Sequence, residues 1–251
     1  MTHWARASVI GTLILAASIL WVACNSGGSP SGTFAPSCDA LGKLERYRYT
    51  YFYEFESPQP TGPIDEAEIG SPPFAILPTS GSFTFSQIFV GKFVSPDRFS
   101  IDVQTPSQPE SPSLPMIIIG DQRWVNLGGV WTEGAASNPF PPLTVCEALL
   151  TELDLEGLPF TSETVNGREA RRFQIKDTPL RTIALLYSPE SDMGRLLTTP
   201  SVDVWITEEG WPARLEIKDQ GTYPSGRELL MDISLDIIDA NAGDIEVEPP
   251  Q

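Results

Sequence analysis

Histidine is almost absent from this chain, because the only one among 251 residues is His3. Beyond that position the chain cannot build a Ser-His-Asp or Cys-His arrangement. It also lacks the commonest metal ligand and the side chain best suited to proton transfer at neutral pH. We therefore expect no resident metal, no cofactor and no enzyme of the ordinary acid–base kind.

Carboxylate chemistry is the one catalytic alternative that this scarcity leaves open. A hydrolase with paired carboxylates, as in glycosidases, needs no histidine. The acids available to it stand at strand-turn or amphipathic-helix positions, where solvated charge is the ordinary state. We consider this class a minor alternative, with these candidates: Asp97, Asp102, Asp121, Glu133 and Glu152.

Basic residues are also scarce, with 16 Lys and Arg against 33 Asp and Glu and a formal net charge of −17. A field of this sign repels nucleic acid and anionic lipid headgroups. No stripe of basic residues interrupts this negative charge. The composition therefore excludes nucleic acid as a partner and is typical of a soluble extracytoplasmic domain.

The chain begins with a segment typical of export. Arg6 is the only charged residue before position 24, and the run 9–23 carries no charge. About 20 apolar residues are needed to cross a bilayer, so this shorter run favours a cleaved signal peptide, residues 1–23, over a membrane span.

A lipid attachment site follows the signal. The residues LWVAC at 20–24 resemble the lipobox of bacterial lipoproteins, which predicts that Cys24 is acylated and becomes the mature N-terminus. Acyl chains on such a cysteine hold a protein on a membrane. Residues 24–37 are rich in Gly, Ser and Pro and predict a flexible tether, so we expect a domain at 38–251 on the outer face of the cell membrane.

Two further cysteines, Cys38 and Cys146, predict a disulfide. In an oxidising compartment a lone pair of cysteines most often forms one. The bond would attach a short opening helix near residues 37–44 to a helix at 143–153, which has apolar residues at helical spacing. A second helical stretch is expected at 180–197.

In the rest of the domain, apolar and polar residues alternate with a period of two, which predicts antiparallel strands. Turn sequences at Gly120-Asp121, Gly128-Gly129 and Asn166-Gly167 join neighbouring strands into hairpins. These patterns predict an α+β, mainly β fold with a single large sheet. The clearest strands are at 44–55, 82–93, 98–104 and 228–239.

One face of this sheet is aromatic, and the sequence leaves two outcomes open for it. A sheet covered by few short helices either packs solid or encloses an apolar cavity. Trp205 and Trp211 flank a hairpin tip, where local cross-strand packing is favoured over an exposed patch for a membrane or partner.

Several segments together resemble the LolA/LolB and LppX/LprG group of lipoprotein-sorting and lipid-carrier proteins: the lipobox and tether, and residues 47–55, 119–133, 202–217 and 241–250. The resemblance implies a half-barrel, a curved antiparallel sheet with two or three short helices on its concave side, closed over acyl chains. It also implies lipid transport, with another envelope protein as a further partner. The expected cavity lining is Tyr49, Tyr51, Tyr53, Phe83, Phe85, Phe89 and Trp124.

The alternative to a lipid carrier is a surface-tethered sensor or protein-interaction module with the same fold and no ligand. An enclosed apolar space of several hundred Å³ fits the carrier, whereas tight packing fits the alternative.

Overall fold

The computed structural model describes residues 38–57, 82–134, 142–150, 153, 155–176, 197–198, 200–222 and 228–250. The predicted signal peptide, Cys24 and the tether lie outside these ranges, as does most of the predicted helical stretch 180–197. Residues 35–251 form one compact unit. Among the described residues, no helix has the length and apolar character needed to cross a membrane.

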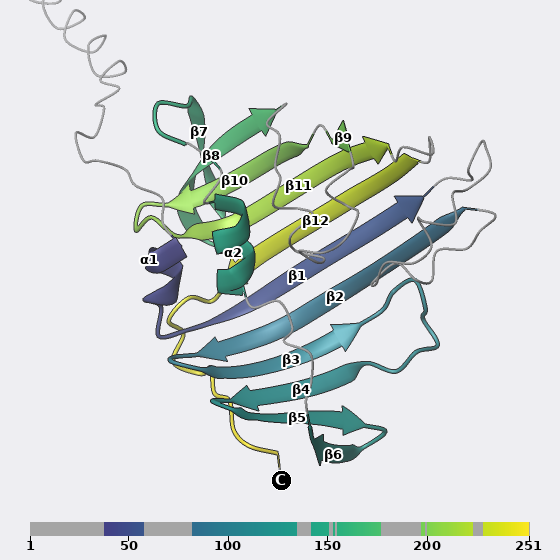
Figure 1. Ribbon diagram of the computed structural model, residues 1–251. Coiled ribbons are helices and arrows are strands. Elements are labelled where there is room, and N and C mark those ends of the chain that lie inside the picture. Colours follow the sequence, from purple (N-terminus) through teal and green to yellow (C-terminus); the bar gives the residue numbers. More distant parts are fainter. Residues whose placement is uncertain are drawn as a thin grey trace, which may run out of the picture. The chain divides into compact units, whose positions relative to one another are not determined.

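One 12-stranded antiparallel sheet forms the core of this unit (Figure 1). Along it the strands follow the order β6-β5-β4-β3-β2-β1-β12-β11-β10-β8-β7, with β9 paired to β11 off this path. The sheet does not close into a barrel. The first half of the chain thus supplies one side of the sheet, the second half supplies the other, and β1 and β12 join them. The strands are β1 (Arg46–Ser57), β2 (Phe83–Val94), β3 (Arg98–Gln104), β4 (Leu114–Ile119), β5 (Gln122–Leu127), β6 (Val130–Glu133), β7 (Phe160–Val165), β8 (Arg168–Lys176), β9 (Leu197–Thr198), β10 (Ser201–Thr207), β11 (Pro212–Thr222) and β12 (Glu228–Ile238).

Two short helices occur in the described chain, α1 (Cys38–Gly42) and α2 (Pro142–Leu150). Both were predicted, and α2 ends three residues before its predicted end. The mainly β class with a single large antiparallel sheet is confirmed. Leu197, predicted as the end of a helix, instead begins β9.

The predicted hairpin turns have the backbone that their residues favour. Gly128 and Gly129 have φ angles of 63° and 93°, and Asn166 and Gly167 have 51° and 76°. Two consecutive positive φ angles are typical of the type I′ turn, whose twist matches that of the strands it joins. Glycine and asparagine reach this region at low cost, so these two hairpins are set by local sequence.

The register of the strands divides the side chains into two faces. Directly paired residues of antiparallel strands point to the same side. One row pairs Tyr51 with Phe89 on β2 and with Leu235 on β12. We call this side, which carries Tyr47, Tyr49, Tyr51, Tyr53 and Phe55, the tyrosine face. The other side carries Arg46, Arg48, Arg172 and Arg214 and is called the arginine face.

The chain after β12 closes one end of the sheet. The backbone N–H of Asn241 donates to the carbonyl of Arg46 at 2.7 Å, and the Asn241 side chain accepts from the N–H of Glu45 at 3.0 Å. Further along, Ile245 and Val247 are buried. This final segment therefore packs against the structure, and the predicted resemblance at 241–250 falls on an ordered part.

Gly91 of β2 provides a test of the packing on the tyrosine face. A Cβ at this position would lie 2.2 Å from Cζ of Tyr49, the residue paired with it across the strands. Changing Gly91 to Ala forces the ring away, and overpacking of this kind costs about 1–3 kcal/mol. We expect urea unfolding to show a loss of that size.

Gly134→Ala is the matched control for this substitution. Nothing lies within 4 Å of the Cβ that it would add, and its φ angle is not positive. We expect its stability to change by less than about 0.5 kcal/mol. Equal effects of the two substitutions would contradict the close approach of Tyr49 to β2.

Candidate functional site

The tyrosine face is apolar across most of the sheet. From Tyr51 one row of directly paired side chains extends in both directions over nine strands. Most of these side chains are buried, with Val204 at 0% exposure and Leu235 at 1%. The row consists of Phe160, Phe173, Val204, Leu215, Leu235, Tyr51, Phe89, Val103 and Leu114.

Aromatic rings cluster where β1 and β2 pair. The ring centroid of Phe89 lies 5.7 Å from that of Tyr51 and 6.0 Å from that of Tyr53. Phe85 lies 5.9 Å from Tyr53. The structure therefore brings together five of the predicted lining residues, Tyr49, Tyr51, Tyr53, Phe85 and Phe89, on one face. The side chain of the sixth, Phe83, lies outside the described set.

Trp124 is separated from these residues. It pairs with Ile117, which pairs with Ser100, which in turn pairs with Lys92 beside Arg48. This register places Trp124 on the arginine face, on the opposite side of the sheet from those five predicted lining residues. Val125, one residue later, pairs with Met116 and belongs to the tyrosine face. Successive side chains of a strand point to opposite sides, but which residues of β5 share the side of Tyr49 follows only from the register.

Burial changes the chemistry of the tyrosines. It raises the pKa of Tyr47, Tyr49 and Tyr53 well above the ordinary tyrosine value, because a phenolate is poorly solvated in an apolar environment. The hydroxyl of Tyr53 donates a hydrogen bond to Oε1 of Gln87. These groups are therefore neutral at physiological pH and suit apolar contact rather than acid–base work.

The arginine face carries a network of charged groups around Trp205. The indole is 5% exposed, with the guanidinium groups of Arg172 and Arg214 at 5.0 Å and 5.7 Å from its ring centre. Its Nε1–H donates to Glu163 at 2.9 Å, and Arg172 donates to both Glu163 and Asp203. The hydrogen bond from Trp205, and then those from Arg172 and Thr161, lower the pKa of the Glu163 carboxyl. Trp205 and Trp211, which is 2% exposed, are thus buried, as the cross-strand packing hypothesis predicted.

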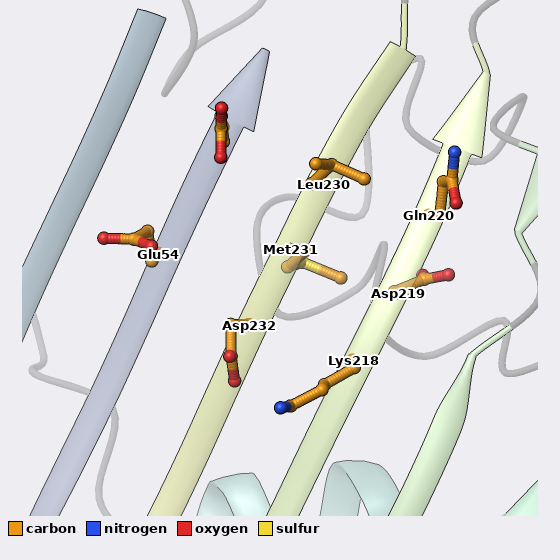
Figure 2. A pocket seen from close by; sticks show the side chains of 8 residues that line it. Glu54, Lys218, Asp219, Gln220, Leu230, Met231 and Asp232 are labelled. Carbon is orange, nitrogen blue, oxygen red and sulfur yellow. The ribbon is translucent and has the colours of Figure 1, made fainter. Parts of the chain in front are cut away.

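A pocket of about 440 Å³ lies where β1, β12 and β11 run side by side (Figure 2). Glu54 is paired with Asp232, and Asp232 with Lys218, all on the arginine face. None of the predicted lining residues belongs to it. No group of three or more potential metal ligands was found in the part of the chain that the structure describes. The pocket is lined by Glu54, Glu56, Lys218, Asp219, Gln220, Leu230, Met231 and Asp232.

The carboxylates considered for hydrolysis come from different turns and strands. Asp97, Asp121 and Glu133 are exposed, and Asp102 is half-buried with Oδ2 accepting from Gln104 at 3.0 Å. Glu152 lies outside the described residues. Asp97, Asp121 and Glu133 thus occupy the solvated positions expected for them, whereas Oδ1 of Asp102 is buried without a hydrogen-bond partner among the described residues.

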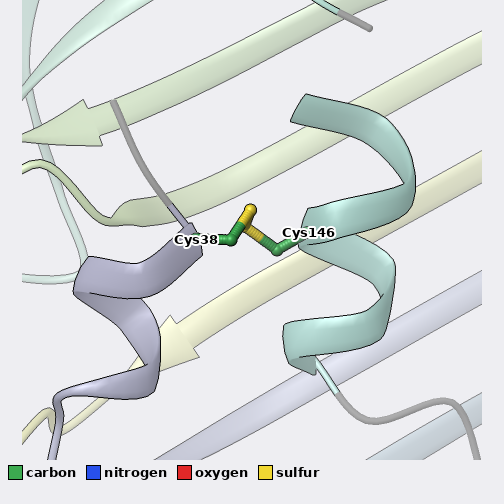
Figure 3. The surroundings of a disulfide bond; sticks show 2 residues. All are labelled: Cys38 and Cys146. Atoms are coloured by element: carbon green, nitrogen blue, oxygen red, sulfur yellow. A yellow bond between two sulfur atoms is a disulfide. The ribbon is translucent and has the colours of Figure 1, made fainter. Parts of the chain in front are cut away.

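The two helices are joined by the predicted disulfide. Cys38 and Cys146 form it with a Cα–Cα distance of 5.8 Å (Figure 3). Leu41 of α1 and Val145 of α2 are fully buried beside this link. The bond closes a loop of 108 residues and attaches the helix that precedes β1 to the one that precedes β7.

Comparison with known proteins gives structural neighbours only, since no family model and no curated protein matches the chain. The lipoprotein LppX from Mycobacterium tuberculosis aligns at 14% identity over 85% of this chain and 94% of its own, with a TM-score of 0.41. LprF from Mycobacterium bovis aligns at 12% identity over 86% and 93%, with a TM-score of 0.46. A LolA superfamily protein from Nitrosomonas europaea aligns at 8% identity over 78% and 88%, with a TM-score of 0.26.

The neighbours belong to the group that the sequence resembles.

Alkaline titration tests the burial of the tyrosines. Their raised folded-state pKa means that the stabilisation is fully present below the unfolded value, near 10, and is lost as pH rises above it. We expect tyrosinate absorbance from these residues to appear together with loss of the circular dichroism of the sheet. In the urea-unfolded control, all tyrosines should ionise near pH 10. Ionisation near pH 10 with the sheet intact would contradict their burial.

Removal of the disulfide tests its contribution to stability. The chain-entropy model gives up to about 4.7 kcal/mol for a loop of about 100 residues. We expect the double variant Cys38→Ser/Cys146→Ser to lose stability of this order in urea unfolding. A reducing agent should destabilise the parent in the same way and leave the double variant unchanged, and a response of the double variant to the reducing agent would point to another cause.

Proposed function

We propose that this protein is a membrane-anchored extracytoplasmic lipoprotein that binds or carries a lipid or other apolar ligand against the tyrosine face. The observation that carries the proposal is the extent of that apolar face. Nine strands contribute to the row through Tyr51, whereas the described helices have five and nine residues.

The dimensions of the elements support this proposal. A nine-residue helix is about 14 Å long and about 10 Å wide. Nine strands spaced by about 4.8 Å extend for roughly 40 Å. One helix of this size covers about two strands. We propose that the sheet curves around the tyrosine face, with α1 and α2 on that side, and that an apolar chain occupies part of the remaining space.

The mechanism would be passive. Apolar surface removed from water contributes about 25 cal/mol per Å², and a hydrocarbon chain requires no covalent step to be held. The tyrosines are already almost fully buried, so the accessible apolar surface of this face comes from its half-buried side chains, among them Phe85, Phe99 and Leu114. Release to a membrane or to another envelope protein would reverse the same transfer.

The proposed location rests on the start of the chain and on the disulfide. The LWVAC segment predicts acylation of Cys24 in the cell membrane. Structural disulfides persist in oxidising compartments outside the cytoplasm. The bond between Cys38 and Cys146, which follows the tether directly, supports an extracytoplasmic domain.

Native mass spectrometry of the full chain, expressed with its own signal in a bacterial host, tests the proposal. We expect a mature N-terminus at Cys24 with the mass of a diacylglyceryl group, and a non-covalent lipid that solvent extraction removes. A domain that is consistently free of lipid would overturn the carrier function and favour the interaction module.

A pair of neighbouring substitutions on β4 locates the ligand. Met116 is buried on the tyrosine face and Ile117 lies on the arginine face. If space for a ligand exists there, Met116→Trp fills it, so lipid is lost while the free energy of unfolding changes little. In a solid core the same change costs about 1–3 kcal/mol. The control Ile117→Trp should retain the lipid.

A further inference from the structure

The hairpin formed by β5 and β6 exposes apolar side chains at its tip. Leu127 is 59% exposed and Val130 is 65% exposed. They pair with each other across the turn Gly128-Gly129. The side chain of Asn126 accepts a hydrogen bond from the N–H of Gly129 at 2.7 Å, which holds the turn. Two aliphatic side chains are thus presented together on an ordered turn.

Two tryptophans lie on the strands that lead to and from this tip. Trp124 and Trp131 come from the same two strands, and both lie half-buried on the arginine face. Tryptophan combines a large apolar ring with an N–H donor and is enriched where membrane and water meet. The hairpin therefore has aliphatic side chains at its end and amphipathic rings directly behind them.

The outer part of the hairpin, residues 124–132, is also free of charge. Between Arg123 and Glu133 there is no charged residue, in a chain that holds 49 of them among 251. A partner recognised through ion pairs would find nothing to bind here. β6 ends the order of strands in the described sheet, so no described strand lies beyond it. These features favour an uncharged apolar environment over a charged protein surface.

The anchor brings a membrane within reach. From Cys24 to Cys38 the chain extends at most about 50 Å, at 3.3–3.6 Å per residue. A domain tethered so closely meets the membrane at a high effective concentration, so that a weak contact suffices to orient it. The net charge of −17 favours zwitterionic headgroups over anionic ones.

We infer that the β5–β6 hairpin tip, Leu127 to Val130, is a second membrane contact that inserts into the outer surface of a zwitterionic bilayer. The inference rests on the proposed lipid anchor. It adds an orientation to the proposed function, because a domain held at both the acylated N-terminus and this tip keeps one fixed side toward the bilayer.

Tryptophan quenching in vesicles tests the contact. The full lipidated chain is reconstituted into phosphatidylcholine vesicles with brominated acyl chains, which quench only nearby rings. Because Trp205 and Trp211 are buried, the signal reports on Trp124 and Trp131. We expect quenching in the parent and, in Leu127→Asp/Val130→Asp, loss of all quenching except any that a bound lipid cargo causes.

Val90→Asp is the matched control. Val90 is 45% exposed on the arginine face of β2, three strands away from β5 and outside the proposed lipid-binding face. We expect this variant to be quenched as the parent is. Equal quenching in the parent and the tip variant would overturn the inference, as would equal loss in the control. A dimer in detergent that the tip variant converts to monomer would also overturn it, in favour of a second copy of the chain.

Native mass spectrometry on the same samples separates this inference from the proposed function. A brominated lipid held as cargo also quenches, but that signal would persist in the tip variant. Lipid cargo without tip-dependent quenching would leave the carrier function standing and reject the membrane contact. Tip-dependent quenching without lipid cargo would support the membrane contact and reject the carrier function.

Discussion

The pairing of β1 with β12 is the interaction on which the rest of the structure depends. β2 to β6 come from the first half of the chain and β7 to β11 from the second, and the sheet is continuous only because residues 48–56 pair with 230–238. This register aligns Tyr51 with Leu235 and thereby joins the apolar sides of both halves into one face. A shift of this register by one residue would place the apolar side chains of one half on the same face as the polar side chains of the other half.

The two faces that result differ in what holds them. On the tyrosine face, burial of rings and aliphatic side chains dominates, and Gly91 makes room for the ring of Tyr49. The arginine face is stabilised by charge pairs, as between Arg214 and Asp236 at 2.7 Å, and by the stacking of Arg172 on Trp205. An acidic chain with few basic residues thus uses several of its arginines to neutralise carboxylates on a single face. The side chains of the tyrosine face are by contrast mainly apolar and buried.

The proposed functions follow from this separation. The proposed cargo would bind the apolar face, and the proposed membrane contact would use the uncharged tip of the hairpin at the end of the sheet. The pocket between β1, β12 and β11 is instead lined mainly by charged and polar residues, among them Glu54 and Lys218. It differs from the predicted cavity in both position and character.

The sequence by itself determined the local features of this protein. Alternation predicted the strands, Gly128-Gly129 and Asn166-Gly167 predicted their turns, and the cysteine pair predicted the disulfide, because each depends on residues close in sequence or on the compartment. Which strands are neighbours was decided only by the tertiary structure. Trp124 shows the reason: alternation along β5 separates two sides, but only pairing through β4, β3 and β2 reveals which of them is the side of Tyr49. The face shared by residues far apart in the chain is a property of register, and register arises from contacts that no local pattern encodes.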